Sequence, residues 1–148
     1  MNVGQICGRH VVTVLPGSDL TAAAALMREK HVGYIVVLES EWVRRPVGVL
    51  TDRDIVVSVV AMKANPASLT VGDVMTPRVV TTEEQSTLDA ALMQMRRNGV
   101  RRLPVLAMNG EVVGVLSIDD ALQAIMDELD SAAGSIRLQR EVERATRS

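Results

Sequence analysis

Two seven-residue stretches, 66 residues apart, decide the fold of this 148-residue chain. The first is Gly-Val-Leu-Thr-Asp-Arg-Asp at residues 48–54, and the second is Gly-Val-Leu-Ser-Ile-Asp-Asp at residues 114–120. Each combines a short apolar run, typical of a buried strand, with a hydroxyl residue and, three positions later, an aspartate, typical of a helix start. The same junction between strand and helix occurs twice, which indicates an internal repeat.

The repeat extends over most of the chain. A shift of 68 residues places Val3-Gly4 on Val71-Gly72 and Met27-Arg28 on Met95-Arg96. Further along, the shift falls to 66 residues, because the first copy has a longer loop at 39–46. Since loops between elements tolerate insertions, this change of register is consistent with a gene duplication.

Both copies are predicted to have the element order β-α-β-β-α, an α/β unit with helices packed on a small sheet. Strands are expected at 11–15, 34–38 and 47–50 in the first copy, and at 79–82, 103–106 and 112–116 in the second. The first helix of each copy is expected to begin after Ser18-Asp19 or Ser86-Thr87. The second helices are expected at 52–62 and 118–129.

The repeat also predicts the domain organisation. The expected divisions are a first domain at 1–62, a linker at 63–70, a second domain at 71–129 and a charged C-terminal tail at 130–148. The tail contains Ile136, Leu138 and Val142, but Gly134-Ser135 interrupt the apolar spacing. Two interpretations of the tail remain open, a helix that packs on a partner and a solvated segment.

Composition and charge exclude several classes of protein. A net charge of −2 and a pI of about 5.7 argue against a broad surface for nucleic acid or anionic membrane. Cys7 is the only cysteine, so no disulfide can form within the chain. No apolar stretch reaches the ~18 residues of a membrane span, and the N-terminus lacks the pattern of a secretory signal. We therefore expect a cytoplasmic protein.

The repeated junction supports two interpretations. In the first, the Thr51 hydroxyl and the Asp54 carboxylate cap the helix start reciprocally, as do Ser117 and Asp120. In the second, the hydroxyl binds a phosphate at the helix start and the aspartate accepts hydrogen bonds from a ribose. The two roles are compatible, and the sequence alone leaves both open.

At this point the chain resembles the cystathionine-β-synthase (CBS) domain family. The resemblance covers residues 3–127 and is carried by 48–54, 71–77, 100–105 and 114–120. It implies an α/β fold of two tandem CBS repeats, packed sheet to sheet as a pseudo-twofold pair (a Bateman-type module). In this family the clefts between the repeats bind AMP, ADP, ATP or S-adenosylmethionine, and pairs commonly dimerise into a flat disc.

The resemblance implies two composite ligand sites, each built from both copies. The first site would consist of Thr51, Asp54, Val80, Arg101, Arg102, Leu103 and Pro104. The second site would consist of Ser117, Asp120, Val12, Thr13, Tyr34 and Ile35. In each site the hydroxyl would contact a phosphate, the aspartate a ribose, and strand backbone groups the adenine edge.

The two sites are not expected to be equal. Where the second copy has Arg-Arg-Leu-Pro at 101–104, the first has Gly-Tyr-Ile-Val at 33–36, so basic side chains come mostly from one side. The first leading segment, at 3–9, also lacks the Met-Thr-Pro that ends the second at 75–77. We expect one good site and one weak or empty site.

The sequence therefore predicts a regulatory sensor that binds an adenine nucleotide or S-adenosylmethionine, forms a homodimer and signals to another protein. We expect no enzyme, no required cofactor and no metal, because no glycine-rich phosphate loop, metal-ligand set or base-activated nucleophile is recognisable. His10 and His31 are interpreted as structural or exposed. The alternative function is a structural or interaction module that binds no ligand and works through its homodimer surface.

Overall fold

The computed structural model describes residues 1–147, which form two three-stranded sheets of identical topology. In the first sheet, β1 (Thr13–Val14) runs parallel to β2 (Tyr34–Leu38), which is antiparallel to β3 (Pro46–Thr51). In the second, β4 (Thr82–Glu83) runs parallel to β5 (Arg102–Leu106), which is antiparallel to β6 (Val112–Ser117). The predicted duplicated α/β fold is confirmed.

The helices follow the repeat with two departures from the expected bounds. Helices α2 (Leu20–Lys30) and α5 (Leu88–Asn98) lie between the first and second strands of each copy. After β3 the chain forms α3 (Asp52–Ile55) and then a π-helical segment, η1 (Val56–Val60). After β6 it forms α6 (Ile118–Arg147), which continues far beyond the expected end at residue 129.

The edge strands β1 and β4 are shorter than the predicted strands at 11–15 and 79–82. Each pairs with its neighbour over two residues, Thr13 with Val36 and Val14 with Val37 in the first sheet. β-branched composition predicts an extended conformation, but a ladder also needs a partner along its whole length.

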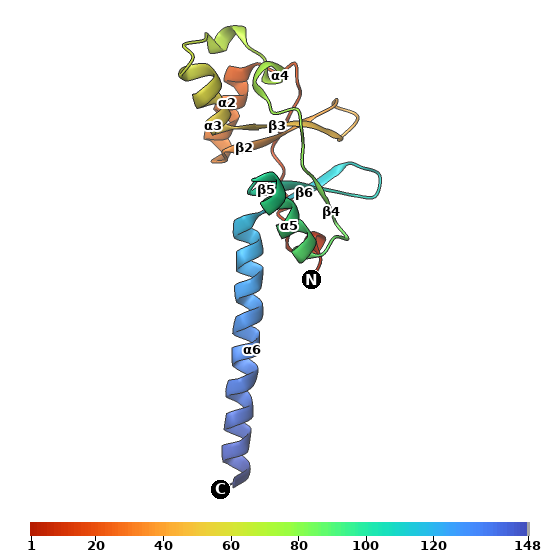
Figure 1. The fold of residues 1–148 in the computed structure, drawn as a ribbon, viewed down its shortest axis with the longest axis vertical. Helices are drawn as coiled ribbons and strands as arrows, with labels where there is room; N and C mark the ends of the chain where they lie inside the picture. The colour runs from red at the N-terminus through yellow and green to blue at the C-terminus, as the bar shows by residue number, and fades with distance from the viewer. Residues whose placement is uncertain (148) are drawn as a thin grey trace.

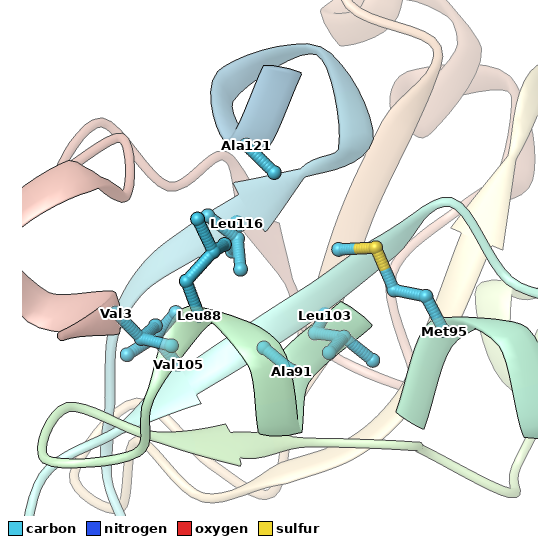
Figure 2. Close-up of a cluster of buried hydrophobic side chains, with 8 residues drawn as sticks. All are labelled: Val3, Leu88, Ala91, Met95, Leu103, Val105, Leu116 and Ala121. Carbon is cyan, nitrogen blue, oxygen red and sulfur yellow. The ribbon is translucent and has the colours of Figure 1, made fainter. Parts of the chain in front are cut away.

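Each sheet is covered by helices over its own apolar core. The first core includes Leu20, Ile35, Leu50 and Val59, which are all at most 1% exposed. Figure 2 shows the second core, which gathers Val3, Leu88, Ala91, Met95, Leu103, Val105, Leu116 and Ala121. The small alanines of α5 and α6 let these helices approach the sheet closely, because close packing leaves no room for larger side chains.

The segments that lead into the two copies exchange places, which the repeat in the sequence does not show. Val3 of α1 (Val3–Ile6) lies in the second core, and its N–H donates to the Ser86 carbonyl at 2.9 Å. Val71 of α4 (Val71–Val74) lies in the first core, and its N–H donates to the Ser18 carbonyl at 2.9 Å. Neither core is complete without the leading segment of the other copy.

Glycines allow these leading segments to cross the sheets. Gly8 and Val115 exchange backbone hydrogen bonds, and a Cβ on Gly114 would lie 2.7 Å from the Gly8 carbonyl oxygen. Thr76 and Val49 pair in the same way, and a Cβ on Gly48 would lie 3.1 Å from the Thr76 carbonyl oxygen. The glycine that opens each seven-residue stretch is therefore required by a close backbone approach.

The two sheets meet through a third apolar cluster, formed mainly by the faces that point away from the helices. Its buried members are Val36, Leu38 and Val112, and Val11, Leu15, Tyr34, Leu106 and Val115 pack against them. The expected packing of sheet against sheet is therefore present.

Helix α6 leaves this body and extends into solvent, with the C-terminus at its far end (Figure 1). The segment 130–147, for which a helix and a solvated tail were both open, is the second half of this helix, and Ser148 lies outside the described residues. Between the copies, the linker contains a short 3₁₀ helix, η2 (Pro66–Ser68). Across residues 1–147, no helix is long and apolar enough to cross a membrane.

Candidate functional site

Two clefts open where the sheets meet, each beside one of the repeated junctions. The first, which we call the Thr51 cleft, has a volume of about 400 Å³. It is lined by Gly33, Tyr34, Val49, Thr51, Asp52, Arg53, Asp54, Thr76, Arg78, Val80, Gly99, Val100, Arg101 and Arg102. These residues come from both copies.

The second, which we call the Ser117 cleft, has a volume of about 290 Å³. It is lined by Gly8, His10, Val12, His31, Val32, Gly33, Tyr34, Val36, Arg102, Val115, Ser117 and Asp120. The volume of the Ser117 cleft is close to the ~300 Å³ at which small-molecule sites begin, and that of the Thr51 cleft exceeds it. The clefts share Gly33, Tyr34 and Arg102, so they lie back to back.

The structure brings most of the first predicted site together. Thr51, Asp54, Val80, Arg101 and Arg102 all line the Thr51 cleft. The other two predicted residues, Leu103 and Pro104, are fully buried next to it, and Leu103 belongs to the second core. They can support the wall of the cleft but do not line it.

The second predicted site is divided more widely. Ser117, Asp120, Val12 and Tyr34 line the Ser117 cleft. Thr13 lines a neighbouring hollow, which shares His10 and Val12 with the cleft. Ile35 is fully buried in the first core, because adjacent strand residues point to opposite faces of the sheet.

Both junctions form the capping arrangement, and in the same geometry. The Thr51 hydroxyl accepts from the Asp54 N–H at 3.1 Å, and the Asp54 carboxylate accepts from the Thr51 N–H at 2.9 Å. The corresponding distances for Ser117 and Asp120 are both 3.0 Å. Because each hydroxyl is an acceptor in this pair, its own proton can still be donated to a ligand.

The charges of the two clefts differ. Four arginines line the Thr51 cleft, Arg53, Arg78, Arg101 and Arg102, against the two carboxylates Asp52 and Asp54. Among the described residues that line the Ser117 cleft, Arg102 is the one arginine or lysine, and Asp120 is the one carboxylate. The Thr51 cleft is therefore the better environment for a phosphate.

The shared wall is a contact between equivalent residues of the two copies. The Arg102 guanidinium lies 5.6 Å from the centre of the Tyr34 ring, a cation–π distance. Burial raises the pKa of Tyr34, although the nearby Arg102 charge lowers it. The phenol therefore stays neutral and can donate a hydrogen bond into a cleft.

Some lining residues were not predicted. Arg53 and Arg78 face the Thr51 cleft, and both histidines, interpreted as structural or exposed, line the Ser117 cleft and are exposed. Arg53 is part of the first seven-residue stretch, and this was the available signal. His10 and Arg78 lie just after the exchanged leading segments, and His31 lies at the end of α2. A single sequence does not reveal that these positions reach the clefts.

Comparisons with known proteins agree with this architecture. The sequence profile of the CBS domain matches residues 3–61 and again residues 71–127. The CBS domain-containing protein YhcV of Bacillus subtilis is 32% identical over 85% of this chain and 85% of its own length. The protein MK0525 of Methanopyrus kandleri is 33% identical over 83% of this chain, which spans 62% of that longer relative.

A solved structure has the same fold. The CBS domain pair of protein MJ0100, in complex with 5′-methylthioadenosine and S-adenosyl-L-methionine, superposes with a TM-score of 0.75 at 20% identity. The match covers 86% of this chain and 98% of that one.

A duplicated α/β unit with two clefts between its sheets defines a tandem-repeat module. This chain belongs to the CBS-domain family and is a pair of CBS domains. The CBS pair is a regulatory module.

Proposed function

We propose that this protein is a sensor of adenosine-containing ligands that binds them between its two CBS domains without turnover. The observation that carries the proposal is the repeated junction, which presents a hydroxyl and an aspartate to a cleft in both copies. A ribose offers two hydroxyls to a carboxylate, and a phosphate accepts from hydroxyl and guanidinium groups. The domains would be 1–62 and 71–129, joined by the linker 63–70.

The ligand of the Thr51 cleft would be an adenine nucleotide, AMP, ADP or ATP. Its four arginines outnumber its two aspartates, which favours an anion over the sulfonium cation of S-adenosylmethionine. The Ser117 cleft, smaller and with one arginine among its described lining residues, would bind the same ligand more weakly or accept a less charged adenosine compound.

The bound ligand would act by favouring one arrangement of the two domains, which needs a different affinity for each arrangement. A ligand bound in either cleft would contact both copies at once, since each cleft is lined by residues of both. We propose a cytoplasmic homodimer that transmits this change to a separate regulated protein.

Thermal unfolding with AMP, ADP, ATP, S-adenosylmethionine and NAD tests the proposal. A ligand of the folded state raises the free energy of unfolding by about 2.7 kcal/mol at a concentration of 100 Kd, so the melting temperature rises with dose. The rise for a nucleotide should be reduced in Arg101→Ala, whose side chain lines the Thr51 cleft and is exposed. Arg97→Ala, exposed at the end of α5, is the matched control and should keep the full rise.

The alternative, an interaction module without ligand, has its own support in exposed apolar side chains. Val56, Val57 and Val60 of η1 are 55%, 51% and 65% exposed. Apolar groups gathered on one segment are typical of a protein-binding surface. If none of the five compounds shifts the melting temperature, the sensor function is rejected for them and this alternative is favoured. Recovery of unaltered nucleotide after incubation with the protein would reject the possibility of an enzyme that acts on that nucleotide.

A further inference from the structure

Helix α6 is far longer than its own domain can cover. Its 30 residues span about 45 Å at 1.5 Å per residue. Only its first turns are anchored, through Ala121, which is fully buried, and Ile125, which packs against the second core. From Met126 to Arg147 every residue except Gly134 is exposed, and the helix extends away from the rest of the chain (Figure 1). An isolated helix is marginal in water, so this length calls for packing against another surface.

One face of α6 has the spacing that packs against another helix. Apolar side chains recur on this face at alternate intervals of four and three residues, at Leu122, Met126, Leu129, Ala133 and Ile136. Leu122, Leu129 and Ile136 are 52%, 65% and 53% exposed. This interval is the heptad pattern of a two-helix seam, in which apolar side chains of one helix fit between those of the other.

The charges of α6 are divided along its length. From residue 118 to 136 it carries five carboxylates and no lysine or arginine. From residue 137 to 147 it carries four arginines and two glutamates. A second α6 laid parallel would place acidic half on acidic half, whereas an antiparallel one places acidic half on basic half.

We propose that α6 pairs antiparallel with α6 of a second copy of this chain, crossing near Ala133 and Gly134. A twofold axis at this point places Asp130 of one copy opposite Arg137 of the other, twice per dimer. The stripe residue at the crossing, Ala133, is small, so the two backbones can approach closely there. The paired helices bury the stripe from Leu122 to Ile136 and hold the two bodies at opposite ends.

The inference specifies the surface of the proposed homodimer and rests on that part of the proposed function alone. Ligand binding occurs in the clefts, which α6 lines only through Asp120 in its first turn. If the protein dimerises through α6 but no nucleotide raises its melting temperature, the sensor function is rejected and this inference stands. If the protein is a monomer that binds nucleotide, this inference is rejected and ligand sensing stands.

A charge exchange tests the pairing in the full-length protein. Asp130→Arg and Arg137→Asp should each raise the dimer dissociation constant about tenfold or more, because each places two pairs of like charges together. The double variant Asp130→Arg/Arg137→Asp should restore the dimer, since the partners are exchanged. Asp127→Arg, on the same helix but away from the stripe, is the matched control and should change dimerisation little. Analytical ultracentrifugation measures the constants, and circular dichroism verifies that each variant is folded.

Cross-linking tests the direction. In a Cys7→Ser background, a short bis-maleimide should join two copies of Ala133→Cys, which lies at the crossing. It should not join two copies of Leu122→Cys, which the antiparallel arrangement separates by roughly 35 Å. Cross-linking at Leu122→Cys would indicate a parallel pair and overturn the inference. A monomer at all concentrations, or a dimer that no α6 variant weakens, would also overturn it.

Discussion

The guanidinium of Arg102 lies 5.6 Å from the centre of the Tyr34 ring, and the two residues occupy equivalent positions in the two repeats. Tyr34 begins β2 and pairs with Thr51, and Arg102 begins β5 and pairs with Ser117. The contact therefore lies between the two junctions and forms a wall of both clefts. One guanidinium therefore lines two clefts at once.

Because the clefts share Arg102, its replacement should affect them unequally. Arg102→Ala should abolish measurable nucleotide binding in the Ser117 cleft, where no other arginine or lysine is found among the described lining residues. In the Thr51 cleft three arginines remain, and we expect a loss of about tenfold, the value of one charge-assisted hydrogen bond. Isothermal titration calorimetry measures both effects as the loss of a weak binding event and the weakening of a strong one.

Arg97→Ala serves again as the control, because it removes the same charge from the chain without touching a cleft. If Arg102→Ala binds nucleotide with the same stoichiometry and affinity as the control, the shared wall has no role in binding.

The single tyrosine gives the clefts a pH signature. Burial raises the pKa of Tyr34 in the folded chain, whereas an unfolded tyrosine titrates near 10. The unfolded state therefore loses its proton first as the pH rises, so the free energy of unfolding is intact below about pH 10 and falls above it until the folded pKa is reached. Tyr34→Phe cannot ionise, so its free energy of unfolding should decline less than that of the parent between pH 9 and 11.

Denaturant unfolding at a series of pH values measures this difference. Tyrosinate absorbance provides a direct control, since the chain contains one tyrosine. A native protein whose tyrosinate signal appears near pH 10 would contradict the burial of this side chain.

The repeat predicted the fold because both cores depend on local patterns. Alternating or continuous apolar residues identify β2, β3, β5 and β6, and helix caps such as Thr87, which accepts from the Ala90 N–H, mark where helices begin. The hydroxyl and aspartate of each junction were found for the same reason, since three residues of spacing place both at one helix start.

What the sequence did not reveal depends on contacts between distant segments. Val3 and Val71 are equivalent in the repeat, and only the packed chain shows that each completes the core of the other copy. For the same reason Arg78 was not expected in a cleft, because its segment reaches the site by crossing β3. The sequence left the continuation of α6 open because Gly134-Ser135 is typical of a helix end, whereas the structure has a continuous helix there.

Glycine at position 114 should be indispensable to the exchange of leading segments. An alanine there would place its Cβ 2.7 Å from both the Gly8 carbonyl oxygen and the Cys7 Sγ, so the N-terminal segment must move. We expect Gly114→Ala to lower the free energy of unfolding by about 2 kcal/mol, as in other overpacked cores. Denaturant titration measures this loss.

Cys7 reports the displacement directly. Its thiol is half-buried, and burial raises its pKa, so it should react slowly with a disulfide reagent in the native protein. In Gly114→Ala the reaction should accelerate. Gly17→Ala is the matched control, because no atom lies within 4 Å of a Cβ at that position. Equal stability and equal thiol reactivity in the two variants would show that the crossing tolerates a side chain.

His31 adopts a left-handed backbone conformation, and the equivalent residue in the second repeat, which adopts the same conformation, is glycine. His31 ends α2 with φ 55°, and the equivalent Gly99 ends α5 with φ 63°. The left-handed conformation costs a residue with a Cβ about 1 kcal/mol relative to glycine. His31→Gly should therefore raise the free energy of unfolding by about 1 kcal/mol, and Gly99→Ala should lower it by a similar amount, both measured by denaturant titration. Because His31 also lines the Ser117 cleft, a stabilised His31→Gly that binds less nucleotide there would show that the strain is retained for the site. If His31→Gly is instead no more stable than the parent, histidine adopts this conformation without cost and the strain argument fails.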